Sequence, residues 1–158
     1  MADLRVGIGV DAHAFADGFP LVLGGVELDH PRGLAGHSDG DVLAHALIDA
    51  LLGAAGLGDI GSLFPSDDDG LRGVSSLVLL AEAYAQVRNA GWRLVNADCV
   101  LIGEGPRIAG LRDEMRARLQ ETVGEGEVNV RATTTDRLGF TGRGEGLAAQ
   151  AVALLELR

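Results

Sequence analysis

The sequence predicts one domain of the α/β class, of the α+β type, spanning residues 1–158. Strand-like and amphipathic helical segments alternate along the chain, glycines separate them, and no internal repeat or low-complexity tract interrupts the pattern. A chain of this length buries on the order of 70% of its unfolded surface, which is ample for one hydrophobic core. We therefore expect the domain to fold without a disulfide or a structural metal.

The first two elements follow directly from hydrophobic periodicity. Residues 4–15 read as a strand. Residues 42–54 carry apolar side chains at helical spacing, which predicts a helix with one buried face. Ser38 or Asp39 is the expected N-cap of that helix, since a short polar side chain there satisfies a free backbone N–H group.

A second helix and a second strand come next. Ser75 or Ser76 is expected to cap a helix whose apolar residues again recur at helical spacing, and Gly91 is expected to stop it. The apolar run over residues 92–103 then reads as a strand. Its single cysteine, Cys99, is expected to be a small core side chain, not a nucleophile.

The last third of the chain predicts a third helix and one further strand. Pro106 is expected to open the helix, which stops near Gly124. Residues 128–135 alternate as a strand does. Residues 147–157 are ambiguous, because alanine and leucine favour a helix while the length suits either state, and local propensity alone predicts a helix.

The charge of the chain excludes one class of function. A formal net charge of −10 argues against non-specific nucleic-acid binding, which requires clustered positive charge. An acidic protein still binds a phosphorylated ligand if metal ions and a few arginines supply positive charge locally. No apolar stretch is long enough to span a membrane and no secretory signal is evident, so we expect a cytoplasmic protein.

Two histidine motifs predict a metal site. Asp11 and His13 are two residues apart on the first strand and therefore share a face, while His45 lies on the first helix. Two imidazoles and one carboxylate form a zinc-compatible set, and three ligands leave one position open, as in catalytic zinc sites. Asp49, one turn beyond His45, is a candidate hydrogen-bond acceptor behind its imidazole. The alternative is that so short a motif arose by chance and that these histidines make ordinary hydrogen bonds.

Two glycine-containing loops add candidate ligands for phosphate. The loop at residues 58–65 runs into an acidic stretch at residues 66–70, which is equally explained as a solvated loop. Residues 133–145 offer hydroxyls, backbone donors, Arg143 and the carboxylate of Asp136, which suits magnesium or manganese. Threonines in this position are also ordinary strand formers.

Several motifs together resemble the family of 2-C-methyl-D-erythritol 2,4-cyclodiphosphate synthases of the non-mevalonate isoprenoid pathway. The likeness runs nearly end to end, and the order and spacing of the motifs exclude chance. The motifs are Gly9-Val10-Asp11-Ala12-His13, His37-Ser38-Asp39-Gly40-Asp41, Leu52-Gly53-Ala54-Ala55, Gly58-Asp59-Ile60-Gly61, Ala132-Thr133-Thr134-Thr135 and Gly139-Phe140-Thr141-Gly142-Arg143-Gly144-Glu145-Gly146.

The resemblance implies an enzyme, a phosphorus–oxygen lyase. Its substrate would be 4-diphosphocytidyl-2-C-methyl-D-erythritol 2-phosphate, whose 2-phosphate attacks the β-phosphorus so that CMP leaves and the 2,4-cyclodiphosphate forms. The attacking oxygen is already anionic, so catalysis is expected to come from folding the substrate and neutralising its charge, not from a strong base.

The resemblance also implies roles for individual residues. Asp11, His13 and His45 would hold one zinc ion per subunit, and Asp136 would hold magnesium or manganese on the diphosphate. His37 and Thr134 match the positions that stabilise the transition state. The substrate-binding set would comprise these residues, without His45, together with Ser38, Asp59, Ile60, Gly61, Phe64, Pro65, Ser66, Asp67, Asp68, Gly103, Glu104, Gly105, Pro106, Arg107, Ala132, Thr133, Thr135, Phe140 and Arg143.

The family's architecture is one mixed β-sheet packed by about three helices on one face, assembled as a homotrimer whose sheets face the threefold axis. The active site then lies between subunits, and residues 147–157 become a strand, against their local propensity, because buried apolar strands need not alternate. Phe140, Arg143 and Glu145 would approach the axis, where an isoprenoid diphosphate is a possible partner. A ring of Arg143–Glu145 ion pairs is the alternative there.

Three residues depart from the family's usual pattern. Asp136 replaces a frequent glutamate and is shorter by one methylene group, which affects the geometry of the second metal. Arg107 replaces a frequent lysine, which changes the shape of the cation. Asp69 replaces a frequent proline, which favours a more flexible loop.

Two alternatives to the cyclase remain open from the sequence. One is a metal-dependent phosphodiesterase on the same scaffold, which would use water as nucleophile and give linear products. The other is a non-catalytic trimer that binds isoprenoid diphosphates and uses zinc only for structure.

Overall fold

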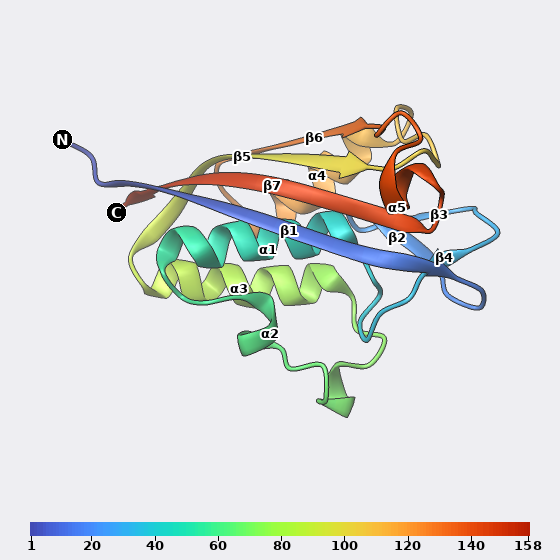
Figure 1. Cartoon of the computed structure of the whole chain (residues 1–158). Helices are drawn as coiled ribbons and strands as arrows, with labels where there is room; N and C mark the ends of the chain where they lie inside the picture. Colours follow the sequence, from blue (N-terminus) through green and yellow to red (C-terminus); the bar gives the residue numbers. More distant parts are fainter.

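A five-stranded mixed sheet forms the centre of the molecule in the computed structural model, which describes residues 1–158 (Figure 1). Only β5 and β6 run parallel, whereas the other neighbouring strands of the sheet pair antiparallel. In spatial order the strands are β4 (Gly33–Leu34), β1 (Leu4–Ala16), β7 (Gly146–Leu157), β5 (Trp92–Ile102) and β6 (Glu127–Thr133).

Three long helices pack on one face of this sheet, as predicted. They are α1 (Val42–Ala55), α3 (Ser76–Asn89) and α4 (Arg112–Val123). The smaller elements are the hairpin of β2 (Leu21–Leu23) and β3 (Val26–Leu28), the one-turn helices α2 (Ile60–Leu63) and α5 (Gly139–Gly142), and a 3₁₀ turn at Asp69–Leu71. None of the helices combines the length and the apolar character that a membrane-spanning helix requires.

Two glycines allow α1 to lie directly against β1. A Cβ atom on Gly9 would lie 1.9 Å from the carbonyl oxygen of Ala46, and one on Gly7 would lie 2.0 Å from that of Ala50. Any larger residue would therefore force the helix away from the strand. This close approach brings the helix residue His45 beside Asp11, the next inward-facing position of β1 after Gly9.

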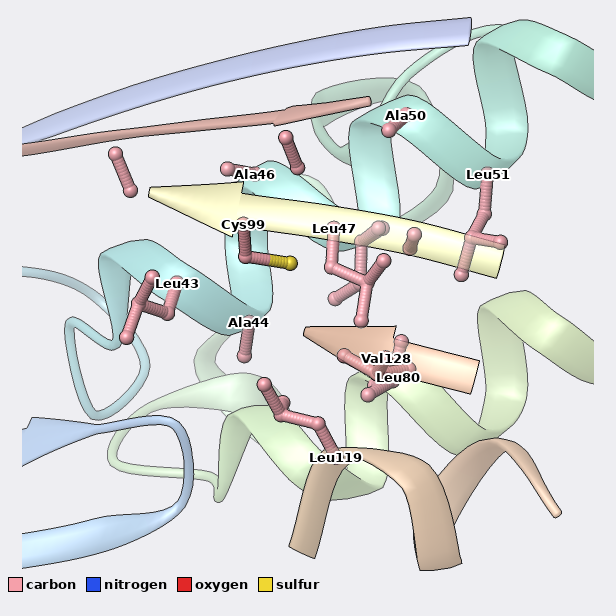
Figure 2. Close-up of a cluster of buried hydrophobic side chains, with 14 of the residues drawn as sticks. Leu43, Ala44, Ala46, Leu47, Ala50, Leu51, Leu80, Cys99, Leu119 and Val128 are labelled. Atoms are coloured by element: carbon pink, nitrogen blue, oxygen red, sulfur yellow. The ribbon is translucent and has the colours of Figure 1, made fainter. Parts of the chain in front are cut away.

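The core fills the space between the sheet and the helices. Figure 2 shows apolar side chains from α1, α3, α4 and the strands meeting in this layer, with the sulfur of Cys99 pointing into it. Cys99 is fully buried, which confirms its predicted place in the core. Burial raises the pKa of its thiol to about 12, so it is not a reactive thiolate at neutral pH.

The opposite face of the sheet is apolar and exposed. Val6, Ile8 and Val10 on β1 are 60–69% exposed, and Val152, the register partner of Ile8 on β7, is 43% exposed. Such a row of branched side chains is typical of a surface that is buried by another chain.

Two predictions about where helices begin need correction. The N-cap of α1 is Asp41, not Ser38 or Asp39, since Asp39 instead accepts hydrogen bonds from Ser76. The third helix begins at Arg112, not at Pro106, because Ile108 packs into the core and a turn precedes the helix. Ser75 is confirmed as the cap of α3, and Gly124 as the cap that ends α4.

Residues 147–157 form the strand β7, which contradicts their local helical propensity and confirms the strand that the resemblance implied. β7 lies between β1 and β5 and pairs with both along most of its length. Two full ladders of backbone hydrogen bonds and burial on the helical face outweigh the small intrinsic preference of alanine and leucine for a helix.

Candidate active site

Asp11, His13 and His45 converge at one point, as the sequence predicted. Oδ2 of Asp11 lies 2.9 Å from Nε2 of His13 and 3.0 Å from Nδ1 of His45. One ligand atom from each of the three residues lies within 4.8 Å of the others. The two imidazole rings meet edge to face, with centroids 5.5 Å apart.

A backbone carbonyl fixes the orientation of His13. Its Nδ1 lies 2.6 Å from the carbonyl oxygen of Ala35, and since that oxygen only accepts, Nδ1–H is the donor. In the neutral ring, Nε2 then carries the lone pair and faces Asp11. A histidine that donates through one nitrogen and offers the other is the usual arrangement at metal sites.

His45 is held from behind by serines and not by Asp49. Its Nε2 lies 2.8 Å from Oγ of Ser76 and 3.0 Å from Oγ of Ser38. The prediction that Asp49 accepts from this imidazole is wrong: Oδ1 of Asp49 accepts from the backbone N–H of Ile60 at 2.7 Å. Asp49 lies one helical turn farther along α1, and there it fixes the start of α2.

Contacts within the cluster shift the pKa values of Asp11 and His13. Burial opposes ionisation of Asp11, but its contacts with His13 and His45 outweigh burial and lower its pKa to about 2. The hydrogen bond to Asp11, which outweighs the opposing effect of burial, raises the pKa of His13. A carboxylate that stays ionised therefore faces the two imidazoles.

The donor set fits zinc. It consists of one carboxylate oxygen and two imidazole nitrogens on rigid elements, β1 and α1, at separations that one ion spans. The bare Nε2 of neutral His13 and the carboxylate of Asp11 are both electron-pair donors, and their close approach is favourable only with a cation or a proton between them. All three residues also line the adjacent pocket.

The cluster forms one wall of a pocket of about 570 Å³. The lining residues are Asp11, His13, His37, Ser38, His45, Ile60, Gly61, Phe64, Pro65, Ser66, Asp67, Leu71 and Leu79. Nε2–H of His37 donates to the carbonyl oxygen of Asp68 at 2.5 Å, which ties the acidic loop to this wall. A separate hollow of about 630 Å³ lies between α4 and β6. None of the predicted site residues lines it, so we do not assign it to the active site.

The pocket brings together one part of the predicted substrate-binding set, namely Ser38, Ile60, Gly61 and Phe64–Asp67 with His37 and the metal cluster. Asp59 and Asp68 do not line it and instead shape its rim. Oδ1 of Asp59 caps α2 by accepting from the N–H of Ser62 at 2.8 Å, and Oδ1 of Asp68 accepts from the N–H of Gly70 at 2.9 Å. Leu71 and Leu79 line the pocket but were not predicted, because apolar residues in a loop or a helix carry no distinguishing signal.

The other predicted contacts form a second cluster that the pocket does not include. Gly103–Arg107 follow β5 and Ala132–Asp136 end β6, so the carboxyl ends of these parallel strands place the two segments side by side. The N–H of Gly103 donates to the carbonyl oxygen of Thr133 at 3.1 Å. Asp136 has a positive φ of 52° and accepts weakly from the hydroxyl of Thr134 at 3.4 Å.

The predicted axial residues lie in and after α5, just before β7 begins. Phe140 is 43% exposed on α5, and Arg143 pairs with Glu145 of the same chain at 2.9 Å. Both charged side chains are more than half exposed. The pairing therefore leaves the guanidinium accessible in the single chain.

The family model described as the YgbB family matches residues 4–156. The 2-C-methyl-D-erythritol 2,4-cyclodiphosphate synthase of Rubrobacter xylanophilus is 57% identical over 161 aligned positions, which cover 99% of this chain and 97% of the relative. The protein of the same name from Alkalilimnicola ehrlichii is 54% identical over 157 positions, covering 96% of this chain and 94% of the relative.

Solved structures agree with these relatives. The bifunctional IspDF from Campylobacter jejuni is 41% identical with a TM-score of 0.95, and the whole of this chain matches 43% of that longer protein. IspF from Plasmodium falciparum, in a CDP complex, is 28% identical with a TM-score of 0.84, and the match covers 98% of this chain and 97% of the other. With its motifs, fold and metal-ligand cluster all in agreement, the chain belongs to the YgbB family.

Proposed function

We propose that this chain is a 2-C-methyl-D-erythritol 2,4-cyclodiphosphate synthase, which converts 4-diphosphocytidyl-2-C-methyl-D-erythritol 2-phosphate into the cyclic diphosphate and CMP in the synthesis of isoprenoid precursors. The observation that carries the proposal is the convergence of Asp11, His13 and His45 on the wall of a pocket of about 570 Å³. The names of the relatives above support the same reaction.

The reaction forms one P–O bond and breaks another. An oxygen of the 2-phosphate attacks the β-phosphorus, and the bond from that phosphorus to the oxygen bridging the α-phosphate breaks, so that CMP leaves with both bonding electrons. The nucleophile is already anionic, so no residue needs to remove a proton. The protein must instead hold two negatively charged phosphates together in line.

The residues of the pocket suit this task. Zinc held by Asp11, His13 and His45 would supply Lewis-acid stabilisation of the charge on the β-phosphate. Phe64, Pro65 and Leu71 provide an apolar wall for the methyl-bearing carbon chain. His37 lines the same pocket, and its Nε2–H, which is bonded to the carbonyl oxygen of Asp68 in the free protein, would stabilise the transferring phosphate by turning from that carbonyl to a phosphate oxygen.

The cytidine end would be bound by the second cluster, by Gly103–Arg107 with Ala132 and Thr133. IspF from Plasmodium falciparum was solved as a complex with CDP, which supports a cytidine nucleotide as ligand here. We further propose that Asp136 holds magnesium or manganese on the diphosphate and that Thr134 stabilises the transition state. A carboxylate and a hydroxyl on one turn are suitable oxygen ligands.

Within one chain, the pocket does not include the second cluster of Gly103–Arg107 and Ala132–Asp136. A homotrimer would bring the pocket of one subunit together with the second cluster of its neighbour. The exposed apolar sheet face of Val6, Ile8, Val10 and Val152 supports this assembly, with the sheets turned toward a threefold axis. Phe140 and Arg143 would then lie near the axis, and we propose an isoprenoid diphosphate as a ligand there.

The test is release of CMP from the cytidine diphosphate substrate in the presence of zinc and magnesium. His13→Ala should lower the rate by at least about 10²-fold, because it removes a metal ligand. His30→Ala is the matched control, since His30 is partly exposed, lies outside the pocket, stacks on Phe15 and bonds only to the backbone of Arg32. Equal rates of CMP release for His13→Ala and the native protein would show that the reaction does not depend on the metal cluster.

A further inference from the structure

A chain of hydrogen bonds lies behind His45, on the side away from Asp11. Ser76, the first residue of α3, is fully buried, and its Oγ lies 2.8 Å from Nε2 of His45. The hydroxyl of Ser76 donates to Oδ1 of Asp39 in a short contact. Oδ2 of Asp39 accepts from the backbone N–H of the same serine at 3.0 Å. Asp39 therefore binds Ser76 with both carboxylate oxygens.

These contacts determine where the protons lie. A serine hydroxyl has one proton, and a carboxylate at this position only accepts, so the proton of Ser76 points at Asp39. Oγ of Ser76 then presents only lone pairs to His45. The contact between Oγ and Nε2 is therefore a hydrogen bond only if Nε2 carries the proton.

We propose that Asp39 and Ser76 act as a relay that fixes His45 as its Nε2–H tautomer, which leaves the lone pair of Nδ1 facing Asp11 and the metal. Both are positioning residues, since they act through the imidazole and not on the substrate. The inference deepens the proposed function and rests on its zinc site. It assigns opposite tautomers to the two histidines: His45 binds through Nδ1, and His13 binds through Nε2.

Ser38 cannot set the tautomer in the same way. Its Oγ also lies near Nε2 of His45, at 3.0 Å, but its other side-chain partner is Oγ of Ser76 at 3.5 Å. The hydroxyl of Ser38 is therefore free to rotate, so it can accept a proton from Nε2 or donate its own to that nitrogen. Of the two serines, Ser76 is the one whose proton is committed elsewhere.

The backbone holds the relay rigid. The N–H of Asp39 donates to the carbonyl oxygen of Val74 at 3.1 Å, and the N–H of Gly73 donates to that of His37 at 2.7 Å. The loop that carries Asp39 is thus bonded to the loop that leads into α3. Ser76 and Asp39 are 37 residues apart in sequence, so neither loop alone contains the relay.

The first test reads the tautomer directly. Long-range ¹H–¹⁵N NMR of protein labelled at histidine, at about pH 9 where a free imidazole is neutral, assigns the protonated ring nitrogen. In both the metal-free and the zinc-loaded protein we expect Nε2 of His45 to carry a proton, and in the zinc-loaded protein we expect Nδ1 to be the metal-bound nitrogen; without the metal, Nδ1 can share a proton with Asp11, 3.0 Å away. An Nε2 of His45 without a proton would overturn the proposal.

The second test reads metal affinity by competition with a chromophoric chelator. Ser76→Ala and Asp39→Asn should each weaken zinc binding by about 10- to 100-fold, the usual effect of losing a partner behind a ligating histidine. Ser75→Ala is the matched control, because it removes the N-cap of the same helix without touching the relay. It should lower the melting temperature but leave zinc affinity unchanged.

The outcomes separate the relay from the zinc site itself. If the native protein does not bind zinc, the metal part of the proposed function fails, whereas the NMR result on the metal-free protein still decides the tautomer. If both relay variants bind zinc as tightly as the native protein, or if Ser75→Ala weakens binding equally, Asp39 and Ser76 only support the fold and the relay is wrong.

Discussion

The thiol of Cys99 shows how the core controls a single titratable group. Burial raises its pKa from 9.0 to about 12, so the folded protein keeps the proton that the unfolded chain loses. The stability that this group contributes is therefore fully present below about pH 9 and is lost as the pH rises toward 12.

Cys99→Ala should remove this part of the alkaline instability. Between pH 8 and pH 10, the native protein is expected to lose on the order of 1 kcal/mol of unfolding free energy through this group alone, a loss that the variant cannot show. Urea unfolding of both proteins at the two pH values measures the difference. The same pH-dependent loss in both proteins would show that the thiol does not titrate as described.

At the scale of elements, the close contact between α1 and β1 positions the metal ligands. Gly9→Ala should destabilise the fold by about 3 kcal/mol or more, because the new methyl group would overlap the carbonyl of Ala46 and backbone cannot move aside cheaply. Zinc affinity should fall as well, since α1 carries His45.

Gly53→Ala is the control for that substitution. Gly53 is an exposed position within α1, and a methyl group there would have only the carbonyl oxygen of Ile8 near it, at 3.9 Å. We expect this variant to gain about 0.5–1 kcal/mol from the better helical propensity of alanine. If urea denaturation finds Gly9→Ala as stable as Gly53→Ala, the close contact does not fix the site.

Elements with a strong periodic pattern were predictable and those decided by long-range pairing were not. The strand of residues 4–15 and the helix of residues 42–54 appear close to their expected bounds, because one buried face dictates their period. Local propensity gave the wrong state for β7, since strands more than 40 residues away decide it. Asp39 looked like a helix cap and instead binds Ser76, a contact that no local pattern reveals.

In the candidate site, the metal ligands were predictable from the sequence but the groups that support them were not. Spacing on a strand and a helix located Asp11, His13 and His45, because residues two apart on a strand share one face. The support of His45 was wrongly assigned to Asp49, since helical spacing shows which residues share a face but not which way a ring turns. The resemblance, not the pattern, supplied the residues beyond the pocket.

At the scale of the whole molecule, the apolar outer face of the sheet should mediate assembly. Ile8→Asp should convert the proposed trimer into monomers, because it would bury three carboxylates near one another, each at a cost of several kcal/mol. CMP release should be lost together with assembly if the site is shared between subunits. Sedimentation velocity gives the oligomeric state, and circular dichroism checks the fold.

Val78→Asp serves as the control for Ile8→Asp. Val78 is 56% exposed on α3, in the helical layer that the proposed interface leaves open. This variant should remain trimeric and active. A trimeric Ile8→Asp, or a native protein that sediments as a monomer at micromolar concentration, would rule out the sheet face as the interface.

We propose that the metal cluster directs an intramolecular phosphate attack, and phosphorus NMR gives the sharpest test of this reaction. The native protein with the cytidine diphosphate substrate, zinc and magnesium should give a pair of mutually coupled resonances from a cyclic diphosphate, together with CMP, and His13→Ala should give neither. Linear phosphates in place of the coupled pair would show that water is the nucleophile and would contradict the cyclase, as would unchanged substrate with a folded, metal-loaded native protein.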